Sequence, residues 1–218
     1  MPDSAQSIDS LNSTSLSNLV SPETPPQATV LIATDVFGHT PAVSGLVRQL
    51  NVNAVIISPW DDPGCHFRTE QEAYQAFIVD GGIGRYAEKL NKVLQQEEAL
   101  KFVIGFSAGA SALWINSERK YMQKIQESVL FYGSRIRDYR DTHPCCPVRL
   151  IFAEQEPAFE PQELVNDLRL RGHSAEIVKG TAHGFMNSYS RGSCVKSQTR
   201  FTTELLHLLH TTRSKAAA

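Results

Sequence analysis

The chain has 218 residues, of which 41% are hydrophobic and 20% charged, and its formal net charge is -2 at pH 7. These values are ordinary for a globular protein and fit one domain, because a chain of this length can bury a single core. The near-neutral charge provides no basic surface field, which argues against nucleic acid as a partner. No apolar run approaches the length of a membrane span, so no membrane insertion is expected.

The four cysteines are Cys65, Cys145, Cys146 and Cys194. None forms a C-x-x-C pair, and with the nearby histidines they give no zinc-binding spacing, so we predict no metal site. The adjacent pair, Cys145 and Cys146, cannot easily reach disulfide geometry. Reduced thiols and a cytoplasmic location are therefore expected.

The chain order predicts a polar tail followed by one domain. Residues 1–27 are rich in Ser, Asn, Thr and Pro, without the basic and apolar regions of a secretory signal, and we expect them to be mostly disordered. The single domain is predicted over 28–212, with 213–218 as a short tail. Apolar runs that favour strands lie at 28–34, 53–58, 102–104, 128–133, 148–153 and 175–178. Helical spacing occurs at 42–50, 69–80, 85–96, 163–171 and 201–210, and again directly after Ser107.

Strands that alternate with helices indicate an α/β fold with a mostly parallel, doubly wound sheet of about six strands. Ligands of such sheets bind beyond the C-terminal ends of the strands. The residues that follow each predicted strand are therefore the candidates for a functional site.

One of these segments, Gly105-Phe106-Ser107-Ala108-Gly109, matches the pattern G-x-S-x-G between a strand and a helix. A sharp strand-to-helix turn exposes a serine hydroxyl, and the helix N-terminus offers N–H groups and a positive dipole to a developing oxyanion. The alternative is a glycine-lined turn without chemistry. The strand before the motif and the helix after it favour a nucleophilic Ser107.

A nucleophilic serine of this kind requires an acid and then a histidine later in the chain. His183 follows the last predicted strand in a loop of small residues and is the expected base, although alone it would be interpreted as a solvated histidine. The turn after 148–153 contains three competing carboxylates. Glu156 is the preferred acid, Glu154 is the second choice, and Glu160 is the third candidate.

The oxyanion hole requires two N–H donors, which we assign to Ala108 and to Val36 in the loop after the first strand. Asp35 precedes Val36, and its carboxylate could steer the Ser107 hydroxyl or simply cap a turn. Trp60, Phe67, Phe37 and Phe185 are candidates either for an apolar pocket or for the core.

Four segments together resemble the dienelactone hydrolase family of the α/β-hydrolases: T-D-V-F-G-H-T (34–40), G-F-S-A-G-A (105–110), F-A-E-Q-E-P (152–157) and A-H-G-F (182–185). The resemblance implies an α/β-hydrolase fold without a large lid and a cofactor-free hydrolase of lactones and other small esters. It places Ser107, Glu156 and His183 at the triad positions, and Val36 and Ala108 at the oxyanion positions.

The sequence also departs from the family pattern. Dienelactone hydrolases use cysteine where this chain has Ser107, and their acid is usually Asp, so Glu156 must sit slightly further back. They carry an arginine four residues after the histidine, where this chain has Asn187; Arg85 and Arg191 are candidates to replace it. The family's N-terminal strands are missing or replaced by the polar tail.

The leading hypothesis is a serine hydrolase that cleaves a small carboxylic ester or lactone through an acyl-enzyme. A second hypothesis is a non-catalytic α/β-hydrolase-fold protein that binds a ligand or partner. A third is acyl transfer to an acceptor other than water by the same residues.

Overall fold

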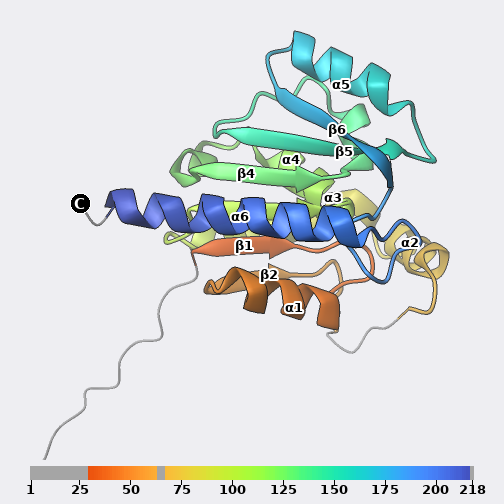
Figure 1. Ribbon diagram of the computed structural model, residues 1–218, viewed down its shortest axis with the longest axis horizontal. Coiled ribbons are helices and arrows are strands. Elements are labelled where there is room, and N and C mark those ends of the chain that lie inside the picture. The colour runs from red at the N-terminus through yellow and green to blue at the C-terminus, as the bar shows by residue number, and fades with distance from the viewer. Residues whose placement is uncertain (1–28, 63–66, 217–218) are drawn as a thin grey trace, which may run out of the picture.

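The computed structural model describes residues 29–62 and 67–216 (Figure 1). Within these residues, six strands form one sheet in the order β2-β1-β3-β4-β5-β6, and every neighbouring pair is parallel. The α/β class, the parallel pairing and the number of strands predicted from the sequence are confirmed. The predicted disordered tail, residues 1–27, lies outside the described residues.

The strands are β1 (Val30–Ala33), β2 (Ala54–Ile57), β3 (Phe102–Phe106), β4 (Glu127–Phe131), β5 (Val148–Gln155) and β6 (Ser174–Ala182). The α-helices are α1 (Pro41–Leu50), α2 (Glu70–Val79), α3 (Gly82–Gln96), α4 (Ala108–Asn116), α5 (Pro161–Leu170) and α6 (Val195–Ala216). Two short 3-10 helices are η1 (Lys120–Lys124) and η2 (Ser134–Asp138).

Two apolar cores lie on opposite faces of the sheet, because successive side chains of a strand point to opposite sides. On β3, Phe102, Ile104 and Phe106 pack into the core that α1 and α6 cover, whereas Val103 packs into the core under α3 and α4. Figure 1 shows α1 and α6 in front of the sheet, with α3 and α4 behind it. The sheet is therefore the middle of three layers.

The chain direction across the sheet reverses between β1 and β3. From β1 the chain crosses to β2 at one edge, and the later strands then add from β3 to β6 on the other side. Such a switch point opens a crevice at the carboxyl ends of the two strands. The segments that begin at Thr34 and at Ser107 leave the sheet at this point.

Several predicted boundaries agree with the structure. Thr69 caps α2, because its hydroxyl accepts a hydrogen bond from the Glu72 N–H at 3.1 Å. The Glu72 carboxylate in turn accepts from the N–H of Arg68. Gly81 separates α2 from α3 with φ of 93°.

The largest departures from the predicted bounds are in β6 and α6, which are both longer than predicted. Strand β6 extends to Ala182, because pairing with β5 resumes after an irregularity and places Gln155 opposite Ala182. Helix α6 begins at Val195 and ends at Ala216, so the helix continues four residues beyond the predicted end of the domain at 212. Apolar spacing marks only the buried part of this helix, around Phe201, Leu205 and Leu209, and its polar first turn gives no such signal. Among the described residues, no helix combines the length and the apolar character needed to cross a bilayer.

Candidate active site

The three residues predicted to react each follow directly on a strand. Ser107 follows β3, Glu156 follows β5 and His183 follows β6. Because the strands are parallel, these positions lie at the same edge of the sheet. The sheet therefore brings together residues that are up to 76 positions apart in the chain.

Ser107 occupies a strained backbone conformation, with φ of 50° and ψ of -109°. A non-glycine residue with positive φ costs about 1–3 kcal/mol, so its surroundings must hold it there. Its N–H donates to the Phe131 carbonyl at 2.9 Å. Its carbonyl accepts from both the N–H and the hydroxyl of Ser111, each at 3.0 Å. These bonds fix the turn on both sides of the hydroxyl-bearing residue.

The two glycines of the motif are required by close packing. A Cβ at Gly105 would lie 2.6 Å from Cα of Ala110, and a Cβ at Gly109 would lie 2.3 Å from the Ala33 carbonyl oxygen. Both distances are shorter than any real Cβ contact. The glycines thus let α4 begin directly against β3 and β1.

His183 links Ser107 to Glu156 through its two ring nitrogens. Ser107 Oγ lies 2.9 Å from His183 Nε2, and His183 Nδ1 lies 2.6 Å from Glu156 Oε2. The His183 N–H also donates to the Gln155 carbonyl at 3.0 Å, which ties the end of β6 to the end of β5. The chain Ser107–His183–Glu156 has the geometry in which an imidazole can take the serine proton while a carboxylate holds the ring.

The competing glutamates are engaged elsewhere. Glu154 Oε2 accepts from the Gly180 N–H at 2.8 Å, and Glu160 caps α5 by accepting from the Gln162 N–H. The extra methylene of Glu156 leaves no gap, because β5 ends directly before it and its carboxylate still reaches the imidazole.

The electrostatics of His183 follow from burial and a buried carboxylate. Burial lowers the pKa of His183, but the hydrogen bond and charge of Glu156 raise it, with further contributions from Glu70 and Asp35, and the net shift is upward. The Glu156 side chain is fully buried, and its Oε1 has no hydrogen-bond partner among the described residues. The carboxylate of Glu156 is thus held against the imidazole by a side chain that is itself fully buried.

The two backbone N–H groups predicted to form the oxyanion hole are those of Val36 and Ala108. Ala108 is the first residue of α4, where a helix N–H has no partner within the helix. The Asp35 carbonyl accepts from the Gly38 N–H at 3.0 Å. Because the Asp35–Val36 peptide is planar and trans, the Val36 N–H points away from this turn. Both residues line the same cavity as Ser107.

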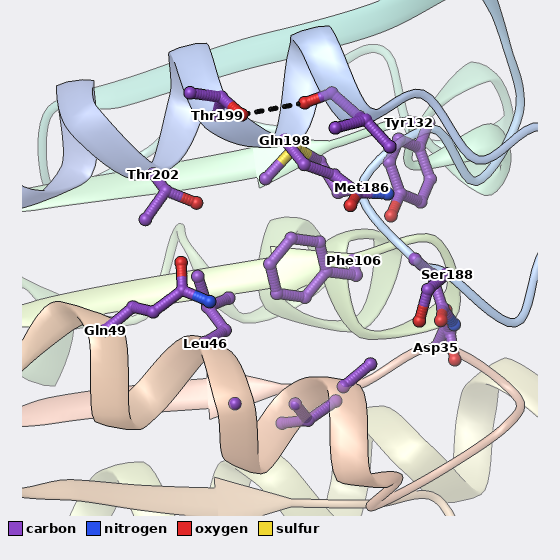
Figure 2. A pocket seen from close by; sticks show the side chains of 15 residues that line it. Asp35, Leu46, Gln49, Phe106, Tyr132, Met186, Ser188, Gln198, Thr199 and Thr202 are labelled. Carbon is purple, nitrogen blue, oxygen red and sulfur yellow. Dashed lines mark hydrogen bonds between the residues drawn. The ribbon is translucent and has the colours of Figure 1, made fainter.

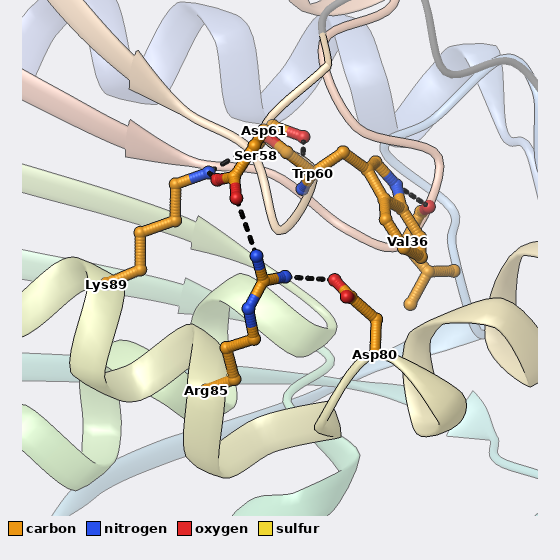
Figure 3. Close-up of polar contacts among 7 residues, drawn as sticks. All are labelled: Val36, Ser58, Trp60, Asp61, Asp80, Arg85 and Lys89. Carbon is orange, nitrogen blue, oxygen red and sulfur yellow. Dashed lines mark hydrogen bonds and ion pairs between the residues drawn. The ribbon is translucent and has the colours of Figure 1, made fainter.

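The Val36 loop is braced from behind by Trp60 (Figure 3). The indole Nε1 donates to the Val36 carbonyl at 2.8 Å. Lys89 Nζ donates to the Trp60 carbonyl at 2.9 Å and pairs with Asp61 at 2.7 Å. The position of Val36 therefore depends on a network that does not touch the cavity itself.

A cavity of about 330 Å³ opens over Ser107. Its apolar wall includes Val36, Tyr74, Phe77, Ile83 and Ala158, and its polar wall includes Glu70, Gln71, Ser134, Arg135 and Arg137. No sequence motif marks the residues that α2 and η2 contribute to this wall. The only signal that could have found them is their place in the chain: the η2 residues follow β4, and the α2 residues lie in the segment 59–80.

No family model matches the chain. A search of curated proteins found YczH of Bacillus subtilis strain 168, a protein described as uncharacterised, at 32% identity over 171 residues, which cover 74% of this chain and 82% of YczH. The chain belongs to the YczH family. Since YczH carries no described activity, this relationship adds no function.

Solved structures show the fold of this YczH-family chain. A candidate dienelactone hydrolase of Klebsiella pneumoniae has a TM-score of 0.63 at 16% identity, covering 85% of this chain and 88% of its own. The dienelactone hydrolase-like promiscuous phosphotriesterase P91 from metagenomic libraries has a TM-score of 0.58 at 14% identity, over 85% and 87%. A candidate α/β-superfamily hydrolase of Xanthomonas campestris gives 0.54 at 13% identity, over 83% and 97%. The α/β-hydrolase fold and its similarity to dienelactone hydrolases are thus confirmed.

Arg85 was a candidate for a substrate-side or a supporting role, and the structure places it on the supporting side. Arg85 pairs with Asp61 at 2.6 Å and also with Asp80, and it does not line the Ser107 cavity (Figure 3). It belongs to the ionic network behind the Val36 loop. Arg191, the other candidate, lines an adjoining groove together with Glu156 and His183.

Asp35 and Asn187 form a buried pair rather than a substrate contact. Asn187 Nδ2 donates to Asp35 Oδ2 at 2.6 Å, and the Phe37 N–H donates to Asp35 Oδ1 at 3.0 Å. The steering of the Ser107 hydroxyl by Asp35 is not what the structure shows, because the Ser107 hydroxyl bonds to His183. Phe37 is buried, and neither its ring nor Asn187 lines the Ser107 cavity.

The other aromatic candidates serve packing. Phe185 is fully buried in the core beneath α6, and Trp60 packs on Phe67 with ring centroids 4.9 Å apart. No group of three or more metal-binding side chains occurs within residues 29–62 and 67–216.

Proposed function

We propose that the protein is a serine hydrolase that cleaves a small carboxylic ester or lactone through an acyl-enzyme. The observation that carries the proposal is the continuous chain from Ser107 Oγ through His183 to the buried Glu156 carboxylate. The strained turn at Ser107 and the fold shared with dienelactone hydrolase-like proteins support the same assignment.

In this mechanism Ser107 Oγ attacks the acyl carbon while its proton passes to His183 Nε2. The carbonyl oxygen gains negative charge and accepts hydrogen bonds from the N–H groups of Val36 and Ala108. Protonated His183 then donates its proton to the leaving alkoxide. A water molecule, deprotonated by His183, attacks the acyl-enzyme and releases the carboxylic acid. Glu156 keeps the imidazole oriented and stabilises its positive charge.

The cavity limits the substrate. A volume of about 330 Å³ is at the small end of ligand pockets, which favours short acyl groups and small lactones. Most of the large apolar side chains that line this cavity, Tyr74, Phe77 and Ile83, come from α2 and from the start of α3. Because Cys145, Cys146 and Cys194 are free thiols, we place the enzyme in the cytoplasm. The reaction requires no cofactor.

The proposal is tested with a fluorophosphonate probe, which reacts only with an activated serine. Wild-type protein should be labelled, and Ser107→Ala and His183→Ala should not. Ser134 lines the same cavity without contacting His183, so Ser134→Ala is the matched control and should label at the wild-type rate. Failure of folded wild-type protein to react would sink the proposal and favour a binding protein with a hydrolase fold.

Substrate class and acceptor are measured next. p-Nitrophenyl esters from acetate to dodecanoate and the lactone dihydrocoumarin form a suitable panel. We expect kcat/KM to fall for acyl chains longer than the cavity accommodates. Product analysis with added methanol or a thiol separates hydrolysis from acyl transfer, since a transferase would form mainly the ester or thioester.

A further inference from the structure

A second cavity, of about 310 Å³, lies between α1 and α6 on the face of the sheet that these helices cover (Figure 2). It has no lining residue in common with the Ser107 cavity. The two cavities nevertheless lie at the ends of the same two strands. Asp35 and Phe106 line the second cavity, whereas the residues that follow them, Val36 and Ser107, line the first. The proposed hydrolase mechanism makes no use of this second cavity.

The inner end of the cavity contains an unsatisfied buried hydroxyl. Tyr132 is fully buried, and its Oη forms no hydrogen bond of ordinary geometry with any described residue. Burial raises the pKa of Tyr132 well above its usual value, and a contact with the Met186 backbone, too poorly aligned to count as an ordinary hydrogen bond, lowers it by less. In Figure 2 the hydroxyl points towards the space between the two helices. Buried polar groups without partners are rare in folded proteins, so this hydroxyl requires an explanation.

The charge of the cavity wall is one-sided. Asp35 is the only charged residue in the lining, and no lysine, arginine or histidine accompanies it among the described residues. Each carboxylate oxygen of Asp35 accepts one hydrogen bond, from Phe37 N–H or from Asn187, and a carboxylate oxygen can accept a second.

The remaining walls combine apolar and neutral polar side chains. The apolar lining residues include Val43, Leu46, Phe106 and Met186. Neutral polar groups come from α1 and α6, and Figure 2 shows Gln49, Gln198, Thr199 and Thr202. A ligand that fits this distribution has a compact apolar body and one hydrogen-bonding head at its inner end.

We propose that this α1–α6 cavity is a second binding site, for a small organic amine whose ammonium group donates to Asp35 and to the Tyr132 hydroxyl. The amine supplies the partner that the buried hydroxyl lacks and the positive charge that complements the single carboxylate. The apolar body lies against Leu46 and Phe106. An anionic ligand is disfavoured because nothing in the lining would neutralise it.

The site is positioned to act on the reaction centre. The Tyr132 ring lies edge-on to the His183 ring, with centroids 5.1 Å apart, and Asp35 directly precedes Val36. A ligand in the α1–α6 cavity would hold Tyr132 and Asp35 in place. Binding itself does not depend on the proposed hydrolase activity, so the two proposals fail separately.

The test uses the full-length Ser107→Ala variant, so that the Ser107 cavity contains no reactive serine. Isothermal titration calorimetry, supported by ligand-observed NMR, compares three probes of the same shape: benzylamine, benzyl alcohol and benzoate. We expect benzylamine to bind with Kd of about 1 mM or below, at least about tenfold more tightly than benzyl alcohol, and benzoate not to bind, because a hydrogen bond to a charged group is stronger than a neutral one.

Substitutions locate the site. Gly45 lines the cavity from α1, and a Cβ there meets only Arg48 at 3.8 Å. Gly45→Leu should abolish benzylamine binding, and the matched control Gly45→Ala should retain it. Asp35→Asn should make the amine and the alcohol bind equally, and Tyr132→Phe should weaken the amine about fivefold.

Three results would overturn the proposal: equal binding of benzylamine and benzoate, unchanged binding in Gly45→Leu, or competition of benzylamine by p-nitrophenyl acetate, which would place the amine in the Ser107 cavity. If Asp35→Asn or Tyr132→Phe fails to fold, the comparison of Gly45→Leu with Gly45→Ala decides the matter alone.

Discussion

Replacing Glu156 by glutamine isolates the role of its charge. The side chain is fully buried and lies 2.6 Å from His183 Nδ1, so glutamine fills the same volume without a negative charge. When His183 becomes protonated, the two charges lie about 4 Å apart, and at an effective dielectric of about 20 their attraction is about 4 kcal/mol. That energy corresponds to about a thousandfold in rate. An amide that turned its NH2 group towards Nδ1 would also favour the wrong imidazole tautomer and add to the loss.

The assay is the second-order rate of fluorophosphonate labelling, followed by kcat/KM for a short p-nitrophenyl ester. Glu156→Gln should lower both by about a thousandfold, with an unchanged circular dichroism spectrum. Glu154→Gln is the matched control, because Glu154 is two residues away and contacts Gly180 N–H instead of His183. Its rates should stay within about threefold of wild type. A Glu156→Gln protein that keeps a third of the wild-type rate would refute the reasoning.

Other expected outcomes concern the histidine, the Val36 loop and the buried aspartate. Because Glu156 raises the pKa of His183, and the base must be neutral, labelling should fall with decreasing pH with an apparent pKa above about 6.5; an apparent pKa below 6 would contradict this. Trp60→Phe removes the hydrogen bond to the Val36 carbonyl and should lower kcat about fivefold with little change in KM, which steady-state kinetics would reveal; an equal rise in KM would instead indicate a damaged cavity. Burial raises the pKa of Asp35 from 3.8 to about 6, so the native state binds this proton more tightly than the unfolded state, and stability falls as pH rises through that range. The free energy of unfolding of Asp35→Asn, measured by urea denaturation, should therefore rise relative to that of wild type by up to about 3 kcal/mol as the pH increases from 4 to 7. A difference between the two proteins that does not change with pH would exclude this linkage.

The sequence predicted the sheet and the residues at its edge because both depend on local patterns. Short β-branched runs mark buried parallel strands, and Ser107, Glu156 and His183 each follow such a run. Once the strands are parallel, their carboxyl ends must share an edge, so the order of motifs along the chain was sufficient to bring the three residues together. The preference for Glu156 over Glu154 agrees with the hydrogen bond to His183.

What could not be predicted depends on contacts between distant segments. Arg85 is a free cation in the sequence, but only the fold shows that Asp61 and Asp80 approach it. The same holds for Asn187, which meets Asp35 from 152 residues away, and for Arg135, which reaches the cavity from η2. The sequence around a charged side chain does not indicate its ion-pair partner, whereas a strand or the G-x-S-x-G turn has a recognisable sequence pattern.

Strained residues lie at the edge of the sheet where function is proposed. The described non-glycine residues with positive φ are Asn51, Ser107 and Tyr132. Asn51 ends α1 in the left-handed conformation, which asparagine tolerates at a helix C-terminus. No such local reason exists for the other two, and each directly follows a strand, β3 or β4.

The strain at Ser107 and Tyr132 is held by hydrogen bonds to the next strands of the sheet. The Ser107 N–H donates to the Phe131 carbonyl of β4, and the Tyr132 N–H donates to the Ile151 carbonyl of β5 at 2.6 Å. The Ser107 hydroxyl faces the Ser107 cavity, and the buried Tyr132 hydroxyl lies beside the α1–α6 cavity. Both side chains also contact His183. Connecting these strands to the segments that follow them does not require a positive φ at either residue. The positions of the strain therefore favour a site that extends from Ser107 through His183 to Tyr132.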